Sequence, residues 1–323
     1  MLRYVLKRVA LLVPVLIGVV FIVFTLLYFA PGDPAYMALG DHASEADYEQ
    51  YREEIGTNGT YTERLIRYYK GLLHGDLGKS YMTKKPITQE LSYRFSRTFV
   101  LATCSFVVGS VIGILMGIVS AVKQYSAFDW FSTVFSLIGI STPTFASGFL
   151  FIIIFAVKLQ LFPASGWGGF DIHLVLPVMT LGFASIGMIM RATRSSMLDV
   201  LKQDYITTAK AKGQTNMSVI FKHALRNALI PIITMCSLQY INLLSGSYIA
   251  ESVFAIAGSG SYMVTALNKR NYAAVLGAVI LLGVIAALIN LLTDLLYTFV
   301  DPRLRTEQKR VKKIKAEAKG AEK

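Results

Sequence analysis

Long runs of apolar residues separated by polar segments are the dominant pattern along this chain of 323 residues. Six runs are long enough to cross a hydrocarbon core of about 30 Å as helices, because a helix rises about 1.5 Å per residue. The pattern therefore predicts an all-α integral membrane protein with six transmembrane helices. The expected spans are residues 9–30, 98–122, 131–157, 174–190, 228–250 and 273–300.

The first run follows three basic residues, so a cleaved signal peptide is the competing interpretation. The apolar region of a signal peptide has about 7–15 residues, and this run is longer. Phe29-Ala30-Pro31 is also a poor cleavage site. We expect residues 1–30 to form a retained N-terminal transmembrane helix.

Two of the other runs carry internal features. In residues 98–122, small residues recur at every fourth position and leave a smooth stripe that another helix can approach closely. Ser141-Thr-Pro-Thr144 lies near the middle of residues 131–157, where proline frees a backbone carbonyl and the hydroxyl groups can compensate. This motif predicts either a structural kink or a bend that lines a passage. The small residues of the stripe are Ser105, Gly109, Gly113, Gly117 and Ala121.

Residues 31–97 form a long polar segment with 10 acidic and 9 basic residues. Its mixed charge and aromatic content predict a small helical region outside the membrane rather than a disordered loop. Clusters of Gly, Pro, Asn and Asp predict turns at 31–34, 56–59 and 75–78. Gly78-Lys79-Ser80 resembles the end of a phosphate-binding loop, but Leu73 replaces the first glycine of that motif, so we interpret it as a turn.

A polar, basic segment at residues 191–227 separates the fourth run from the fifth and predicts two short helices joined at Gly213. Asp204 is expected to cap the first helix, with Lys210 and Lys212 in its last turn and Gly213 in a left-handed conformation. Thr215 or Asn216 then caps the second helix. The apolar stripe expected on one face comprises Ile206, Ala209, Gly213, Met217 and Ile220.

Composition and charge agree with a membrane protein, since the chain is 54% hydrophobic with a mean hydropathy of +0.52. The net charge of +12 comes from basic clusters beside apolar runs, which indicates orientation rather than a nucleic-acid partner. Of 32 Lys and Arg, 20 lie on the side expected to carry the N-terminus, 3 in two short opposite loops and 9 in the long segment 31–97. The positive-inside rule then predicts that both termini, residues 191–227 and a basic tail at 301–323 are cytoplasmic.

Enzymatic chemistry is not expected, because the spans contain no paired carboxylates, metal-spaced histidines or nucleophile motif. Cys104 and Cys236 fall within apolar runs and indicate neither a disulfide framework nor a metal site. Asp294 is the only carboxylate within an expected span, and it keeps an ion-coupled secondary transporter or channel as the alternative. A transport protein without an ion-coupling group or nucleotide-binding loop takes its energy from a partner.

From Met1 to about Arg305, the chain resembles the membrane-spanning permease subunits of binding-protein-dependent ABC importers of the dipeptide, oligopeptide and nickel class. The coupling-helix motif of that family is commonly Glu-Ala-Ala, three residues, then Gly. Thr207-Thr208-Ala209 and Gly213 occupy those positions here, and the two threonines depart from the motif. Ala257-Gly-Ser-Gly260 is a second departure, because Pro-Gly-Leu-Gly is usual there, and Ser96 replaces a common proline. Further similar stretches are Ala30-Pro-Gly-Asp-Pro34, Gly75-Asp-Leu-Gly-Lys-Ser80, Leu176-Pro177, His223-Ala-Leu-Arg-Asn-Ala228, Glu251-Ser-Val-Phe254 and Asp301-Pro-Arg303.

The resemblance implies a five-helix permease core at residues 98–300 after the N-terminal helix, in the plasma (inner) membrane of a prokaryote. It implies a heterodimer with a second similar permease, two cytoplasmic ATPase subunits and an extracytoplasmic solute-binding protein. ATP and Mg would be bound by the ATPase subunits, so no cofactor or metal is expected in this chain. Di- and oligopeptides are the expected cargo, with nickel complexes and glycosides as alternatives.

The resemblance and the polarity of the spans also identify candidate site residues. The loop after the fifth span, with Glu251, Phe254, Gly258 and Gly260, is expected to form an extracytoplasmic gate. Polar candidates for the translocation path are Ser141, Thr142, Gln239, Asn242, Ser245 and Ser247. The expected ATPase-docking residues of the coupling helix are Asp204, Tyr205, Thr207, Thr208, Ala209, Lys210, Ala211, Lys212 and Gly213.

Overall fold

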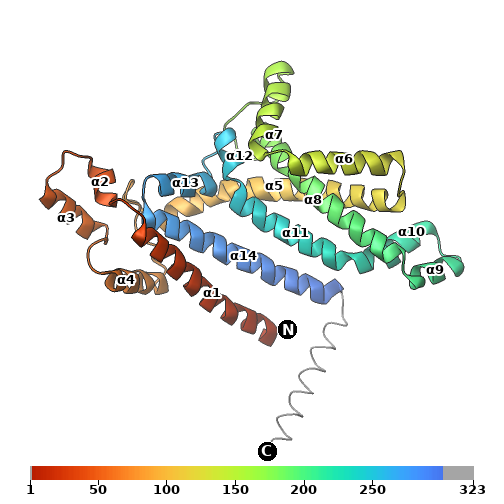
Figure 1. Cartoon of the computed structure of the whole chain (residues 1–323), viewed down its shortest axis with the longest axis horizontal. Helices are drawn as coiled ribbons and strands as arrows, with labels where there is room; N and C mark the ends of the chain where they lie inside the picture. Colours follow the sequence, from red (N-terminus) through yellow and green to blue (C-terminus); the bar gives the residue numbers. More distant parts are fainter. Residues whose placement is uncertain (1, 301–323) are drawn as a thin grey trace, which may run out of the picture. The chain divides into compact units, whose positions relative to one another are not determined.

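The computed structural model describes residues 2–300, and in that range the chain is helical with one isolated β-bridge, between Lys79 and Pro86 (Figure 1). The expected basic tail at 301–323 lies outside the described residues. The first half comprises α1 (Leu2–Phe29), α2 (Pro34–Leu39), α3 (Glu45–Glu54), α4 (Tyr61–Leu73), α5 (Ile87–Val122), α6 (Ala127–Ser141), α7 (Thr144–Phe151) and the π-helical η1 (Ile152–Lys158). The second half comprises η2 (Ile172–Leu174), α8 (Val175–Leu201), α9 (Asp204–Ala211), α10 (Asn216–Ser218), the π-helical η3 (Val219–Leu225), α11 (Arg226–Gly246), α12 (Tyr248–Val253), α13 (Ser259–Asn268) and α14 (Tyr272–Val300).

Five stretches of helix within the described residues are long and apolar enough to cross a membrane, and they confirm five of the expected spans. The remaining span is a pair of helices, Ala127–Ser141 and Thr144–Lys158, bent by 107°. Pro143 explains the break, because a residue before proline avoids the helical conformation and proline itself has no N–H to donate. The sequence motif thus produces a sharp corner where we expected a span with an internal bend.

Two helices extend well beyond their apolar runs. α5 begins at Ile87 rather than at Thr98, and α8 continues past Met190 to Leu201. Hydropathy marks the part of a helix that suits lipid, whereas the helix itself continues until a cap or a turn ends it. The extensions carry polar residues that the hydrophobic pattern assigned to segments outside the membrane.

The chain divides into two compact units. Unit 1 comprises Met1–Val107, Thr142–Gly182 and Tyr240–Ala287, and unit 2 comprises Val108–Ser141, Phe183–Gln239 and Leu288–Lys323. The main core of unit 1 joins α1, α5, α13 and α14, with Leu27, Ile87, Tyr262 and Ala274 among its buried residues.

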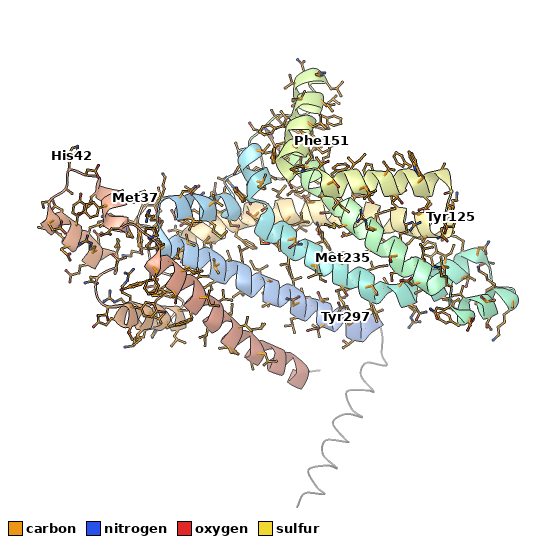
Figure 2. The ribbon with its side chains drawn as sticks, in the orientation of Figure 1. Met37, His42, Tyr125, Phe151, Met235 and Tyr297 are labelled. Atoms are coloured by element: carbon orange, nitrogen blue, oxygen red, sulfur yellow. The ribbon has the colours of Figure 1, made fainter. Side chains whose placement is uncertain are left out.

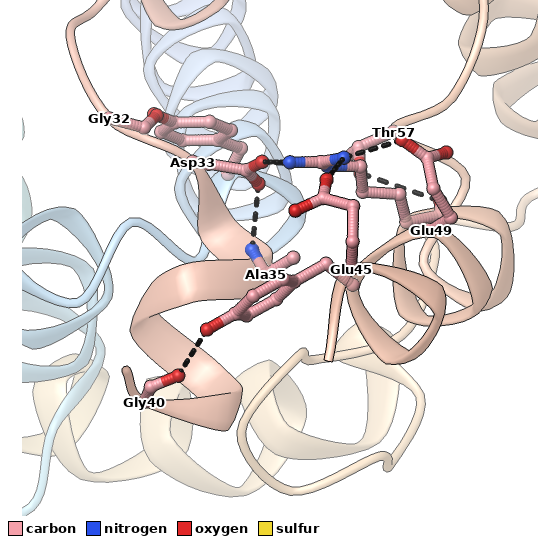
Figure 3. Close-up of polar contacts among 10 residues, drawn as sticks. Gly32, Asp33, Ala35, Gly40, Glu45, Glu49 and Thr57 are labelled. Atoms are coloured by element: carbon pink, nitrogen blue, oxygen red, sulfur yellow. Dashed lines mark hydrogen bonds and ion pairs between the residues drawn. The ribbon is translucent and has the colours of Figure 1, made fainter. Parts of the chain in front are cut away.

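The polar segment between α1 and α5 is helical, as its composition predicts. α3 begins with a capping box at Ser44, and α4 begins with one at Thr60. In each box the hydroxyl accepts from the N–H of the third helical residue, and the carboxylate of that residue accepts from the N–H of the capping residue. Asp33 caps α2 and also accepts a hydrogen bond from Arg52, whose Nε lies 2.7 Å from Asp33 Oδ2 (Figure 3). These local hydrogen bonds hold α2 and α3 together as a small folded region.

Close helix packing in unit 2 depends on glycine. A Cβ atom at Gly117 would lie 2.7 Å from the Met190 carbonyl oxygen, and one at Gly187 would lie 2.7 Å from the Ser136 carbonyl oxygen. α8 therefore approaches both α5 and α6 more closely than any larger residue would allow. Gly113 and Gly117 confirm that part of the predicted small-residue stripe receives a neighbouring helix.

Candidate functional site

The short helix α9 begins and ends largely as expected. Its N-cap is Gln203 with no side-chain hydrogen bond, and Asp204 is its first residue, so the prediction that Asp204 caps the helix was wrong. Gly213 has φ +76°, which confirms the left-handed ending, and its N–H donates to the Lys210 carbonyl at 2.9 Å. Thr215 caps the next helix by accepting from the Ser218 N–H. Lys212 forms the C-cap of α9.

One face of α9 is buried against unit 2 itself. Ile206 has no exposed surface and Ala209 is 7% exposed, and both belong to an apolar core that also contains residues of α5, α8, η3 and α11. Figure 1 shows α9 and α10 beside the adjoining ends of α8 and α11. The partners in this core are Ile118, Ala121, Met197, Val219, Ala224, Ala228 and Ile232.

The opposite face of α9 is exposed. It comprises Tyr205, Thr207, Thr208, Lys210 and Ala211, continued by Lys212 and Gly213. Beyond Gly213 the apolar stripe proposed from the sequence is only partly present: Ile220 packs against the same core, but Met217 is 64% exposed and Val219 is buried instead. The left-handed residue changes the direction of the chain, so a single helical period cannot cover both helices. We call this exposed face, with its buried base, the α9 knob.

A buried ion pair lies at the same end of unit 2, and the sequence did not reveal it. Asp129, in the first turn of α6, is 4% exposed and accepts from Arg194 Nε at 2.6 Å and Arg194 Nη2 at 2.8 Å. The Ser120 hydroxyl and the Tyr125 N–H also donate to this carboxylate. Every lone-pair direction of the carboxylate thus meets a donor, which is the arrangement that makes a buried ion pair tolerable.

This ion pair fixes the helix that leads into the knob. Ser120 lies near the end of α5, Asp129 begins α6, and Arg194 lies on α8 shortly before α9. The only sequence signal was one acidic residue between two apolar runs and one arginine in the basic segment. Hydrophobic periodicity cannot pair two residues 65 positions apart.

A second buried carboxylate, Glu251, organises the predicted gate in unit 1. Its side chain has no exposed surface. Oε1 accepts from the Thr98 hydroxyl at 2.6 Å and the Ser247 hydroxyl at 2.9 Å, and Oε2 accepts from the Ser261 N–H at 2.7 Å. Within the described residues no basic side chain forms an ion pair with it, so neutral donors alone solvate this carboxylate.

The predicted gate glycines are the residues that allow this arrangement. A Cβ atom at Gly258 would lie 2.4 Å from Glu251 Cδ, and one at Gly260 would lie 3.0 Å from the Tyr248 Cα. Thr98 extends the network, because its oxygen accepts from the Ser259 N–H at 2.8 Å. Phe254 is also fully buried, and its carbonyl accepts from Gly166 N–H at 2.9 Å. The structure therefore brings Glu251, Gly258 and Gly260 together and places Phe254 against the loop at Gly166.

The predicted translocation-path residues are not equivalent. Ser141, Asn242 and Ser245 are exposed, whereas Thr142 and Gln239 are half-buried, and Gln239 Nε2 donates to the Ser185 hydroxyl at 3.1 Å. Ser247 has no exposed surface and donates to Glu251, so it contributes to the Glu251 network. The sequence showed Ser247 as a polar residue in an apolar run, but it did not show that the hydroxyl donates to Glu251.

Further polar contacts in unit 2 join α11 to α14. The Thr234 and Tyr297 hydroxyls lie 2.6 Å apart, and Thr293 donates to the Ser237 hydroxyl at 2.6 Å. Figure 2 labels Met235 and Tyr297, which mark the two helices that these contacts connect. Both cysteines are free, and the described residues contain no group of three or more His, Cys, Asp or Glu side chains that could hold a metal ion.

Two family models cover nearly the whole chain. The model described as "Binding-protein-dependent transport system inner membrane component" matches residues 109–306, and the model of the corresponding N-terminal region matches residues 1–102. This chain belongs to that family. It is therefore a permease subunit of a binding-protein-dependent ABC importer, a multi-pass protein of the prokaryotic plasma membrane, and its family implies ATPase and solute-binding partner subunits.

Several relatives of this permease are similar over nearly their whole length. The dipeptide transport system permease protein DppB of Alkalihalophilus pseudofirmus is 39% identical, covering 94% of this chain and 100% of its own. The glutathione transport system permease protein GsiC of Pectobacterium atrosepticum is 40% identical, covering 94% and 99%. The DppB protein of Escherichia coli K12 is 36% identical, also covering 94% and 99%.

Two solved structures share the fold of the permease. A chain of an inward-facing MetNI methionine ABC transporter has a TM-score of 0.53 and 19% identity, covering 66% of this chain and 97% of its own. A chain of an amino acid ABC transporter determined with histidines has a TM-score of 0.52 and 14% identity, covering 65% and 93%. At such low identity, these structures establish the fold and nothing about the cargo.

Proposed function

We propose that this permease forms a heterodimer with a second similar subunit and imports short peptides, with its α9 knob docked on a cytoplasmic ATPase. The relatives named as dipeptide and glutathione permeases support the peptide cargo, because the similarity covers almost the full chain. ATP and Mg bind the ATPase subunits in this proposal. Both termini and the knob face the cytoplasm, in agreement with the distribution of Lys and Arg.

The structure of the α9 knob is the main support for the docking role. α9 exposes small and basic residues on one face, while Ile206 and Ala209 fasten the other face to an apolar core shared with α5, α8 and α11. A docked partner can contact the exposed face closely, and a displacement of the knob moves the ends of several membrane helices together. The Asp129–Arg194 ion pair adds a rigid connection from α8 to α5 and α6. Cores and interfaces of this kind shift between discrete arrangements rather than deforming gradually.

The Glu251 network supplies the corresponding element at the proposed outer gate. It ties Thr98 of α5 to α12 and to the first turn of α13. Its donors are hydroxyls and one backbone N–H, which can exchange partners more readily than a bidentate arginine. We assign Ser141, Thr142, Gln239, Asn242 and Ser245 to the translocation path and Ser247 to the gate network.

The docking role is tested on the exposed face, because bulk at Ala209 would also disrupt the permease's own core. Ala211→Trp and Thr207→Trp should each lower peptide-stimulated ATP hydrolysis and uptake of the reconstituted complex at least ten-fold, while leaving membrane insertion intact. Tyr125→Trp is the control, because Tyr125 is 89% exposed outside the knob. Gly213→Pro should also abolish coupling, since proline requires φ near −65° and Gly213 has φ +76°.

Normal stimulated hydrolysis and uptake in Ala211→Trp and Thr207→Trp would refute the docking role. The energy source needs a separate measurement, since an ion-coupled transporter is the alternative. Uptake that stops on ATP depletion at constant membrane potential supports the proposal. Uptake that instead follows an imposed ion gradient without nucleotide would refute it.

A further inference from the structure

A cavity of about 230 Å³ lies within unit 1, and none of its lining residues is a predicted gate or path residue. It is lined by α4, by the ends of α1 and α14 and by the loops at residues 55–57 and 76–81, and it is open to solvent. Part of its lining is apolar and aromatic, formed by Phe24, Leu27, Tyr28, Tyr272 and Leu276. We call it the α4 cavity.

The polar side of the α4 cavity offers hydrogen-bond donors without matching acceptors. The Tyr68 hydroxyl is buried, and among the described residues it has no hydrogen-bond partner. The Arg64 guanidinium stacks on the Tyr28 ring, 4.9 Å from its centroid, and forms no hydrogen bond or ion pair with a described residue. Both side chains line the same cavity, and the carboxylate of Asp76 is the charged group near the Tyr68 hydroxyl. Buried polar groups in proteins almost always find a partner, so the orphan hydroxyl and the unengaged guanidinium of this cavity indicate a missing acceptor.

The charge balance also favours an anion. Arg64, Arg67 and Lys79 line the cavity against a single carboxylate, Asp76. Asp76 Oδ1 is already used by the Gly78 N–H at 2.8 Å, and Arg67 is engaged with the Gly56 carbonyl and the Asn58 side chain. Burial raises the pKa of Tyr68, so its hydroxyl stays protonated near neutral pH and can donate. Arg67 and Lys79 are exposed, so the cavity is accessible from solvent on that side.

The size of the cavity defines the rest of the ligand. A cavity of about 150 Å³ lined by apolar side chains holds benzene, so about 230 Å³ accommodates a phenyl-sized group with a carboxylate attached. Guanidinium and carboxylate groups match in geometry and can form two parallel hydrogen bonds. The aromatic wall formed by Phe24, Tyr28 and Tyr272 suits the apolar part of such a molecule.

We propose that the α4 cavity binds the carboxylate end of a short peptide whose last residue is hydrophobic, with Arg64 and Tyr68 as the carboxylate ligands. One part of this proposal rests on the proposed function: that the bound carboxylate belongs to the transported peptide. The binding itself requires neither ATP hydrolysis nor uptake. Its failure is therefore distinguishable from a failure of the proposed transport function.

The test is isothermal titration calorimetry on the full-length chain within its purified complex, in nanodiscs of neutral phosphatidylcholine. The probe is acetyl-phenylalanine, and the matched neutral ligand is acetyl-phenylalaninamide, which has the same ring and no carboxylate. We expect saturable binding of the acid and at least ten-fold weaker binding of the amide. Arg64→Gln should weaken acid binding at least ten-fold, and Tyr68→Phe about ten-fold, since a hydrogen bond to a charged group is lost while the ring remains.

Arg94→Gln is the control variant. Arg94 stacks on the Tyr262 ring at 4.7 Å and is half-buried, as Arg64 is, but it lies outside the α4 cavity. Its replacement should leave acid binding unchanged. Absence of saturable acid binding, equal binding of the amide, or unchanged binding in Arg64→Gln and Tyr68→Phe would each overturn the proposal.

A second arm identifies the source of the carboxylate. The dipeptide alanyl-phenylalanine should displace acetyl-phenylalanine competitively, whereas its C-terminal amide should not. Failure of the dipeptide to compete would overturn the assignment to peptide. Repeating the titration in nanodiscs that contain phosphatidylglycerol should leave the affinity unchanged, and competition by this lipid would assign the cavity to a phosphate headgroup and overturn the proposal.

Discussion

The two buried carboxylates of the permease are stabilised in opposite ways. Asp129 in unit 2 pairs with the two-pronged guanidinium of Arg194 and has one hydroxyl and one backbone N–H as additional donors. Glu251 in unit 1 has two hydroxyls and one backbone N–H, and no described cation. An ion pair tolerates the loss of one neutral donor, whereas a carboxylate solvated only by neutral donors depends on each of them.

The difference suits the proposed roles of the two regions. The Asp129 site would transmit force beside the α9 knob and needs a fixed geometry, which a bidentate ion pair provides. The Glu251 site would belong to a gate that changes shape, and neutral donors on three different segments can separate at a lower cost than opposite charges. The comparison predicts different sensitivities to mutation at the two sites, which the following variants measure.

The largest effect is expected for Asp129→Ala. Removal of one partner of a buried ion pair leaves the other charge uncompensated and costs about 3–5 kcal/mol. The Arg194 side chain is 26% exposed, so water reduces the effect toward the lower value. The melting midpoint of the purified full-length chain should fall markedly. Adding Arg194→Leu should recover much of the loss, and a double variant as unstable as Asp129→Ala would contradict the role of the pair.

Gly258→Ala should have the next largest effect. The added Cβ would lie 2.4 Å from Glu251 Cδ, and such overpacking costs about 1–3 kcal/mol. Gly246→Ala is the matched control, because a Cβ there meets nothing within 4 Å. The melting midpoint should fall only for Gly258→Ala. In a Glu251→Ala background, Gly258→Ala should destabilise the protein much less. An unchanged loss of stability would show that the carboxylate does not require this glycine.

The contrast between these sites also shows what sequence can and cannot predict. Local rules correctly predicted the left-handed Gly213, a cap at Thr215 or Asn216 and five of the six apolar spans, because each depends on neighbouring residues. The Thr98–Glu251 contact joins residues 153 positions apart. In the sequence Thr98 only begins an apolar run, because its hydrogen bond to Glu251 is decided by how the helices pack. A chain's polar residues show that a buried network exists, but not which of them meet.

The same limit explains the contacts that the sequence did not predict. Met217 fitted the helical period through Ile206, yet the left-handed Gly213 redirected the chain and left Met217 exposed. The sequence marked Ser247 only as a polar residue, and its hydrogen bond to Glu251 depends on packing. Periodicity assumes one continuous helix, and polarity alone does not distinguish a hydroxyl that lines a passage from one that solvates a buried charge.

Thr98→Val tests the dependence of Glu251 on neutral donors. Valine keeps the shape of threonine but removes the donor to Glu251 Oε1 and the acceptor of the Ser259 N–H. Leaving these buried groups unsatisfied costs about 1–3 kcal/mol. The melting midpoint should fall in Thr98→Val and remain near the wild-type value in Thr265→Val, since Thr265 bonds only within its own helix and is exposed. Equal midpoints for the two variants would remove Thr98 from the network.

Ser120→Ala is the counterpart in unit 2 and should have the smallest effect. The Ser120 hydroxyl donates to Asp129 Oδ1, but after its removal the carboxylate keeps both Arg194 contacts and the Tyr125 N–H. Arg194 Nε loses only a secondary acceptor, 3.1 Å away, and keeps Asp129. The cost should be about 0.5–1.5 kcal/mol, the usual net value of one hydrogen bond, and lower than that of Thr98→Val in the same melting assay. If Ser120→Ala proved as costly as Thr98→Val, the cation would not protect Asp129 from the loss of a neutral donor, and the distinction between the two carboxylates would fail.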